Sequence, residues 1–323
     1  MDFKRPFSTL LAAGALAATA TATSTALAQE TKVAIGISGW TGFAPLTLAN
    51  EAGLFKKNGL DVSIKKIPQK DRHLAIASGD IQCAATTVET WVVWNANGVA
   101  TTQIFQLDKS YGADGMVTKP GIAKITDLKG KTVAASAPGT SPYFALAWML
   151  KKNGMSVKDV KVATLEPQPA ANAIIAGTAD LDAAMTYEPY LSAVRAKPEA
   201  GKIIATTLDY PMVMDTFGCT PKFLKENPKA AKALADSYFA ALDLIKSDPK
   251  KSFEVMGADV KQSGEAFEKS AAFLRWQDRA ANQKFFAGEH AQFSKEAADL
   301  LLEIGIIKQL PDMNALADTT FIK

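Results

Sequence analysis

Carboxylates fall at the positions of this chain where a buried site can form. Five of them lie near predicted strand ends or chain crossovers: Glu89, Asp108, Asp114, Glu188 and Asp215. A carboxylate taken out of water needs a partner, because an unpaired buried charge is costly. A ligand ammonium or guanidinium could be that partner. These residues therefore indicate a binding site for a small molecule with a positive group.

Cations suited to a simple inorganic anion are scarce at the same positions. Only Arg72 and Lys109 lie nearby in the sequence, whereas a pocket for nitrate or sulfate alone should carry Arg, Lys or His at its turns. The carboxylates also have alternative roles. Glu188 precedes a proline and could be a charge at a helix start, and Asp114 and Asp215 could bond the backbone at a hinge.

A hydroxyl-rich helix start could hold an anionic group or a carbonyl. Thr140 and Ser141 precede a proline at the start of the predicted helix 142–153, and a hydroxyl cap followed by proline is a typical start signal. The free N–H groups of a helix N-terminus favour an anion. The alternative is that both hydroxyls only cap the helix.

Aromatic side chains accompany these polar groups. Trp40, Trp91, Tyr143 and Tyr187 could stack on a flat ligand or cover a cation. A cation over an aromatic face gains ~0.5–2 kcal/mol. Ordinary core packing is the alternative for each ring.

Motifs for catalysis or metal binding are weak. His73 and His290 are the only histidines, and they are not spaced as metal ligands. The chain has no G-x-S-x-G elbow and no G-x-G-x-x-G, and the GKT at 130–132 lacks the upstream glycine of a Walker loop. We expect no enzymatic activity, no cofactor and no metal.

The elements that must position these residues alternate between strand and helix. Apolar runs bounded by Gly, Asp or Pro predict strands at 32–38, 61–67, 81–86, 102–107, 114–118, 131–136, 161–165, 181–186, 203–208 and 214–220. Helical patterns cover 45–56, 70–77, 87–97, 125–128, 142–153, 168–176 and 187–196. Beyond residue 220 the pattern becomes consecutive helices, at 221–246, 250–256, 263–275, 282–287 and 295–304. The alternation predicts an α/β protein with parallel sheets flanked by helices.

The turns after the strands are where a ligand should bind. In open parallel sheets, ligands bind beyond the carboxyl ends of strands and against helix N-termini. The turns at 38–43, 86–91, 136–143 and 186–190 meet this condition. The candidate ligand-binding residues on these turns and at the two crossovers are Trp40, Thr41, Thr87, Glu89, Trp91, Asp114, Ser136, Thr140, Ser141, Tyr143, Tyr187, Glu188 and Asp215.

Cys83 and Cys219 are the only cysteines, and both lie in apolar strand-like runs. We expect two buried free thiols, with a disulfide as the alternative in an oxidising compartment.

The first residues have the pattern of an export signal. Lys4 and Arg5 precede the mostly apolar run 7–20, and Ala26-Leu27-Ala28 is a cleavage signal, so 1–28 is predicted to be a signal peptide cut after Ala28. Its removal takes the formal net charge from +3 to +2, too small to indicate nucleic-acid binding. No cysteine follows the cleavage site to carry a lipid. We expect a soluble monomer in the periplasm.

Five segments in order carry a family resemblance. They are PLTLANEAGLFKKNGLDV, LAIASGDIQCAATT, DLKGKTVAASAPGTSPYFAL, AIIAGTADLDAAMTYEPYL and KENPKAAKALADSYFAALDLIKSDP. Together they resemble the periplasmic solute-binding proteins of ABC importers, in the subgroup that handles nitrate, sulfonates, taurine and thiamine-precursor pyrimidines.

The resemblance implies a two-lobed periplasmic-binding-protein fold of type II. Each lobe would be a mostly parallel sheet flanked by helices, with two crossover strands between the lobes and a helical C-terminal tail. Lobe 1 would comprise 29–112 and 215–323, and lobe 2 would comprise 113–214. The solute would bind in the cleft between the lobes, which close by a hinge motion, and would pass to a permease in the inner membrane.

We expect a small nitrogen- or sulfur-containing organic solute of the zwitterion type, with a flat cation as the alternative ligand class and with two other roles open. A zwitterion such as taurine or an alkanesulfonate-like solute would use the helix start at Thr140 and Ser141 for its anion and the carboxylates for its amine. A flat cation such as guanidinium, or an aminopyrimidine, would fit the carboxylates and aromatic rings better. An enzyme of the pyrimidine-synthase type and a ligand sensor for a membrane receptor are the other roles.

Overall fold

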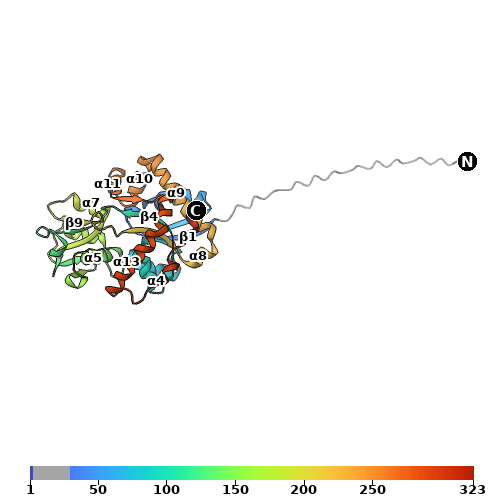
Figure 1. Ribbon diagram of the computed structural model, residues 1–323. Helices are drawn as coiled ribbons and strands as arrows, with labels where there is room; N and C mark the ends of the chain where they lie inside the picture. The colour runs from blue at the N-terminus through green and yellow to red at the C-terminus, as the bar shows by residue number, and fades with distance from the viewer. Residues whose placement is uncertain (3–29) are drawn as a thin grey trace.

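The computed structural model describes residues 1–2 and 30–323. The predicted cleavage site after Ala28 and all but the first two residues of the predicted signal peptide lie outside the described residues. The described chain forms two β-sheets with helices around them. The two sheets lie side by side in Figure 1. No helix of the described residues is both long and apolar enough to cross a membrane.

The first sheet has six strands in the order β11-β4-β10-β3-β1-β2. Their bounds are β1 Thr31–Ile37, β2 Leu60–Lys66, β3 Cys83–Thr87, β4 Thr102–Ser110, β10 Met214–Cys219 and β11 Leu274–Trp276. β1 pairs in parallel with β2 and β3, and β10 runs antiparallel between β3 and β4. Because β10 joins this sheet from far along the chain, it brings Asp215 beside Thr87 and Asp108.

The second sheet has five strands in the order β7-β6-β8-β5-β9. Their bounds are β5 Asp114–Thr118, β6 Thr132–Ala134, β7 Lys161–Ala163, β8 Ala183–Tyr187 and β9 Lys202–Thr206. β6 is parallel to β7 and β8, whereas β5 is antiparallel to β8 and β9. We call the first sheet with its helices lobe 1 and the second sheet with its helices lobe 2.

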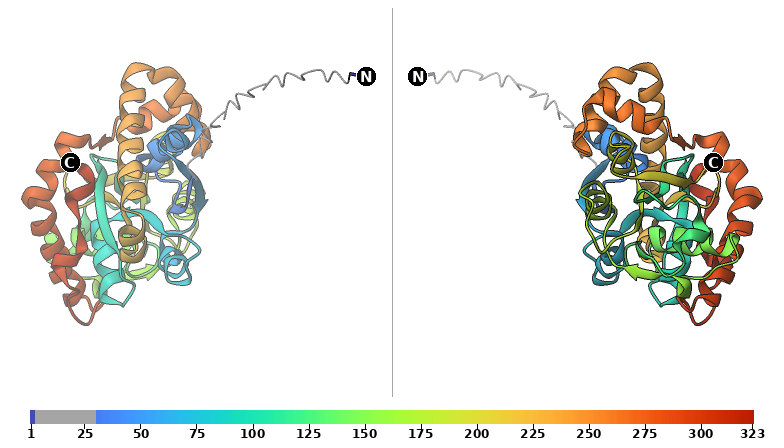
Figure 2. Two further views of the ribbon diagram at one scale, coloured as in Figure 1. Left: turned by 90° about the vertical axis from the view of Figure 1, so that its right-hand side faces the viewer. Right: turned by 90° about the vertical axis from the view of Figure 1, so that its left-hand side faces the viewer.

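Helices cover both sheets. Those of the alternating part are α1 Ala44–Glu51, α2 Leu54–Lys57, α3 Gln69–Ser78, α4 Val88–Ala96, α5 Ser141–Lys152, α6 Pro167–Ile175 and α7 Tyr190–Arg195. Those of the C-terminal part are α8 Pro221–Glu226, α9 Pro228–Ser247, α10 Pro249–Asp259, α11 Gly264–Ala271, α12 Arg279–Lys284 and α13 His290–Glu303. In Figure 2 the orange helices α9 to α11 gather at one end of the molecule, and the red α13 runs along one side.

Two short segments join the lobes. The chain passes from β4 to β5 through 111–113 and returns from β9 to β10 through 207–213. Two sheets flanked by helices, two crossovers and a helical C-terminal part confirm the predicted fold class. The exact residue division between the lobes stays a prediction.

Apolar packing also crosses between the lobes. One cluster joins α4 and α13 to the core of the second sheet, and it includes Trp91, Phe144 and Phe293. The rings of Phe144 on α5 and Phe293 on α13 lie 6.3 Å apart, edge to face. The helical C-terminal part therefore packs against lobe 2 as well as lobe 1.

Three boundaries in the helical predictions are wrong. The helix expected over 45–56 is interrupted at Gly53, whose φ of 69° is left-handed. The helix expected over 221–246 breaks at Asn227, because Pro228 starts a new helix. The pattern at 263–275 ends as the short strand β11, which pairs with the edge of β4.

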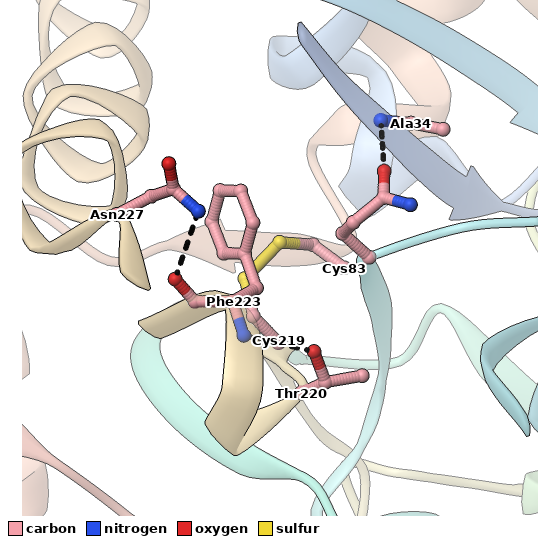
Figure 3. Close-up of a disulfide and its surroundings, with 7 residues drawn as sticks. Ala34, Cys83, Cys219, Thr220, Phe223 and Asn227 are labelled. Carbon is pink, nitrogen blue, oxygen red and sulfur yellow. Dashed lines mark hydrogen bonds between the residues drawn. A yellow bond between two sulfur atoms is a disulfide. The ribbon is translucent and has the colours of Figure 1, made fainter. Parts of the chain in front are cut away.

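The two cysteines form a disulfide, so the expectation of free thiols is wrong. Cys83 opens β3 and Cys219 ends β10, and these antiparallel strands pair the two residues directly, with Cα atoms 3.9 Å apart. Figure 3 shows the bridge beside Phe223, at the start of α8. The alternation of strand and helix cannot predict this pairing, because 136 residues separate the two cysteines.

Candidate functional site

A small cavity lies between the two lobes, beyond the ends of their strands. Its volume is about 20 Å³, which is space for roughly one water molecule. A solute of several heavy atoms therefore needs the surrounding side chains or the lobes to move apart. The cavity is lined by Ser38, Trp40, Phe43, Gln69, Arg72, Thr87, Asp114, Ser141, Tyr187, Val213 and Asp215.

Four buried carboxyl groups lie in or beside this cavity. Asp215 is paired with Asp108 across the β10–β4 ladder, Asp114 opens β5, and Glu89 lies in the first turn of α4. One oxygen each of Glu89, Asp108 and Asp114 has no hydrogen-bond partner among the described residues. The sequence predicted Glu89, Asp114 and Asp215 as candidates, and the structure brings these three together with Asp108.

Burial raises the pKa of every carboxyl in this group. The pKa of Glu89 rises to about 8, because burial outweighs hydrogen bonds from the Thr87 and Ser141 hydroxyls. Burial and the charge of Glu188 raise the pKa of Asp114 to about 7, against a hydrogen bond from Ser110. The pKa values of Asp108 and Asp215 lie well above the usual range, first because of burial and then because of neighbouring carboxylates. The cluster therefore favours protonated carboxyls unless a cation arrives.

Arg72 on α3 is the one cationic side chain among the lining residues. It is fully buried, and burial lowers the pKa of its guanidinium to about 10. Its N–H groups donate to the backbone carbonyls of Ile67 and Ala85. Arg72 is thus bound to the backbone of lobe 1 and pairs with none of the four carboxylates.

Two aromatic rings from different lobes meet at the cavity. The rings of Trp40 and Tyr187 lie 5.4 Å apart, edge to face. The indole N–H of Trp40 is directed at Asp108 Oδ2, 3.4 Å away. Burial raises the pKa of Tyr187, so its hydroxyl stays neutral. Trp91, by contrast, lies in the core, where it donates to Thr216 Oγ1 at 2.7 Å.

The start of α5 reaches the cavity only through Ser141. The Ser141 backbone N–H donates to Gln69 Oε1 at 3.1 Å, across the two lobes. The Thr140 hydroxyl donates to the carbonyl of Ala137 at 2.6 Å and does not cap the helix. Thr140 and Tyr143 do not line the cavity.

The remaining candidates lie outside the cavity lining. Ser136 has a left-handed φ of 58° and donates to Glu166 at 2.8 Å. Thr41 is buried, and its hydroxyl has no partner among the described residues. Glu188 pairs with Arg195 and accepts from the Ser192 backbone N–H at 3.1 Å. Burial still raises the pKa of Glu188, but this carboxylate already has a cation of its own.

Sequence reasoning missed Gln69 and Val213 and noted Arg72 only as a nearby cation. It also left Ser38 and Phe43 out of the candidates, although both belong to the predicted turn 38–43. The signal for Gln69 was present: it follows the end of β2, which lies at the same sheet edge as the ends of β1 and β3. The same rule that selected the other turns would have selected residues 67–69.

Comparison with known proteins identifies the family. A model of the family described as NMT1/THI5 like matches residues 40–252. This chain belongs to the NMT1/THI5-like family. The family resemblance found in the sequence is thereby confirmed.

The individual relatives have low sequence identity to this chain. A Brucella abortus (strain 2308) protein named only as a binding protein is 24% identical over 242 residues, covering 73% of this chain and 74% of its own length. The taurine-binding periplasmic protein of Escherichia coli (strain K12) is 28% identical over 217 residues, covering 65% of each chain. The alkanesulfonate-binding protein SsuA from Xanthomonas axonopodis pv. citri, solved with MOPS, has a TM-score of 0.77 at 18% identity, covering 90% of this chain and 100% of its own. At that identity, the structural likeness shows the fold alone.

Proposed function

We propose that this chain captures a small solute with a protonated nitrogen group in the interlobe cleft and delivers it to an ABC permease. The supporting observation is the cluster of Asp108, Asp114, Asp215 and Glu89, all buried. The nearby Arg72 donates to backbone carbonyls and forms no ion pair with any of them; its charge only partly opposes the upward pKa shift of Asp215. A cationic ligand would supply the missing positive charge, and its arrival would favour ionised carboxylates.

The geometry favours a compact, flat cation of the guanidinium or aminopyrimidine class. The little open space favours guanidinium, the smallest of these ligands, whereas an aminopyrimidine is no smaller than taurine and needs the lobes to move apart. Trp40 and Tyr187 present aromatic surface beside the carboxylates, and such surface attracts a cation. A planar ligand with several N–H groups could also donate to the unpartnered oxygens of Asp108 and Asp114.

A zwitterion such as taurine is the second candidate. The relative from Escherichia coli named as a taurine-binding periplasmic protein supports this class. The ammonium of taurine would bind the same carboxylates, and the sulfonate of taurine would need the start of α5 or Arg72. Both of these already have partners within the chain, so the site favours this ligand less.

The transport role rests on the family and on the predicted signal peptide. Family membership, a two-lobed fold and export together support a periplasmic protein that serves a permease. We expect no catalysis, because the sequence has no G-x-S-x-G elbow and no histidines at metal-ligand spacing. A pull-down with the purified protein as bait would separate transport from sensing. Capture of an ABC permease supports transport, and capture of a membrane receptor supports sensing.

A thermal-shift panel followed by calorimetry tests the ligand class. The panel contains guanidinium, an aminopyrimidine, taurine, ethanesulfonate and nitrate. A ligand at about 100 times its Kd adds about 2.7 kcal/mol to the free energy of unfolding. We expect stabilisation by guanidinium or the aminopyrimidine. Stabilisation by nitrate and ethanesulfonate alone would show that the acidic cluster does not select the ligand.

A further inference from the structure

Gln69 connects the two lobes at the cavity. It is the first residue of α3 in lobe 1, and its Oε1 accepts from the backbone N–H of Ser141, the first residue of α5 in lobe 2. A backbone N–H can only donate, so the amide oxygen of Gln69 must face it. The NH₂ group then faces lobe 1.

Three threonine hydroxyls hold that NH₂ group in place. Gln69 Nε2 lies 2.8 Å from Thr86 Oγ1, 2.9 Å from Thr90 Oγ1 and 3.4 Å from Thr87 Oγ1. The Thr87 hydroxyl in turn donates to Glu89. Gln69 is therefore fixed at both ends of its amide and does not need a ligand to order it.

The N-terminus of α5 has this amide as its acceptor. α5 runs for 12 residues, and Thr140 at its N-cap makes no side-chain cap. Helix N-termini attract anions through their free N–H groups and the helix dipole. Here the Gln69 carbonyl supplies the partial negative charge, and the Thr87 hydroxyl beside Gln69 links it to the carboxyl of Glu89.

We infer that Gln69 is a specificity-determining residue, whose carbonyl takes the position at α5 that the anion of a sulfonate or carboxylate ligand would need. The inference rests on the proposed function in placing the ligand in this cleft. The site then accepts a cation through the carboxylates and rejects a ligand with an anionic end. No ligand anion can reach the Ser141 N–H without displacing an amide that is hydrogen-bonded at both its oxygen and its NH₂ group.

The test compares the binding of ethanesulfonate and of guanidinium by calorimetry. Gln69→Ala and Gln69→Met both remove the carbonyl, and the second keeps most of the side-chain volume. Each should bind ethanesulfonate about tenfold more tightly than the natural chain does. Gln69→Glu keeps an acceptor with a full charge and should gain nothing. Gln292→Ala, an exposed change on α13, is the matched control and should bind like the natural chain.

The outcomes separate this inference from the proposed function. Equal ethanesulfonate binding by the natural chain and by both Gln69→Ala and Gln69→Met would overturn the role of Gln69, as would an equal gain in Gln69→Glu. Failure of the natural chain to bind guanidinium would instead count against the proposed cationic ligand. The ethanesulfonate comparison needs no cation and stays decisive in that case. Thermal unfolding of each variant shows that it is folded before titration.

Discussion

Asp108 and Asp215 are paired across two antiparallel strands, β4 and β10, with both carboxyl groups buried. Burial raises the pKa of both groups well above the usual range, and the charge of neighbouring carboxylates raises it further. Two neighbouring buried carboxylates repel each other, so the site favours a protonated form of the pair when no cation is present. The pair therefore binds a proton or a cation, and the two compete for the same place.

Removal of one of these charges should weaken cation binding without unfolding the protein. Asp215→Asn should reduce the binding free energy of guanidinium by about 2–5 kcal/mol, because a buried charge pair is lost. The free energy of unfolding of the ligand-free protein should stay the same or rise, since Asn cannot ionise and the cost of keeping a buried carboxyl away from water and from Asp108 disappears. Calorimetry and thermal unfolding measure the two effects. Asp243→Asn, exposed on α9, is the control. Full guanidinium affinity in Asp215→Asn would remove Asp215 from the site.

Cation affinity should rise with pH between 6.5 and 8. The raised folded pKa values of Glu89, about 8, and Asp114, about 7, mean that the folded protein holds protons which the unfolded chain has lost. The contribution of these groups to stability is largest below their unfolded values and is lost as the pH rises through their folded values. His290, whose pKa burial lowers to about 4, acts in the opposite sense: as the pH falls below its usual value of 6.5, the unfolded chain takes up a proton that the folded protein does not, which lowers stability.

The ligand-free protein should therefore become less stable from pH 6.5 to 8, while guanidinium binds more tightly and releases protons. Thermal unfolding at both pH values measures the first effect. Calorimetry in two buffers of different ionisation enthalpy counts the protons released. An affinity that does not change over this window would contradict proton–cation competition at Asp114 and Glu89.

Gly42 allows Trp40 to approach Asp108. A Cβ at Gly42 would lie 2.1 Å from Asp108 Oδ2 and 2.2 Å from Trp40 Nε1, well inside contact distance. Gly42→Ala should displace both side chains, cost about 1–3 kcal/mol of stability and weaken guanidinium binding. Gly288→Ala is the matched control, because its Cβ would meet no atom within 4 Å. Equal behaviour of the two variants in thermal unfolding and calorimetry would show that this contact does not shape the site.

The sequence could predict the elements and the turns around the site, because local patterns carry them. The strand expected at 114–118 has those bounds in the structure, and Trp40, Thr87 and Ser141 come from turns chosen by the strand-end rule. The direction of each side chain was harder to predict. Trp91 is three residues into α4, and the helix turns it to the core beside Trp94.

Long-range pairing could not be predicted, since no local pattern sets it. The place of β10 between β3 and β4 decides that Asp215 meets Asp108 and that Cys219 meets Cys83. The partner of Glu188 is Arg195, seven residues later, and α7 with its preceding turn brings the two together. β11 forms only because the edge of β4 is available to pair with it.

The disulfide should stabilise the strands that carry the site. It joins β3 to β10, the strands of Thr87 and Asp215, across a separation of 136 residues. A Cys83→Ala, Cys219→Ala double variant should lose about 2–4 kcal/mol in free energy of unfolding. Thiol titration of the denatured, unreduced protein should find no free thiol. Two free thiols in that titration would mean that the bridge does not form.

Glu188 should matter for stability and not for the ligand. Its carboxylate pairs with Arg195, which also donates to the Gly112 carbonyl at 2.9 Å and lies 3.9 Å from the ring centre of Phe273. Glu188→Gln should lower the free energy of unfolding by about 1–3 kcal/mol, because Arg195 loses its partner. Guanidinium affinity should not fall by more than about twofold, since Glu188 does not line the cavity and acts on it only by raising the pKa of Asp114. Glu265→Gln breaks an exposed pair with Lys269 and should change stability by less than about 0.5 kcal/mol. A tenfold loss of guanidinium affinity in Glu188→Gln, at unchanged stability, would show that Glu188 belongs to the binding site.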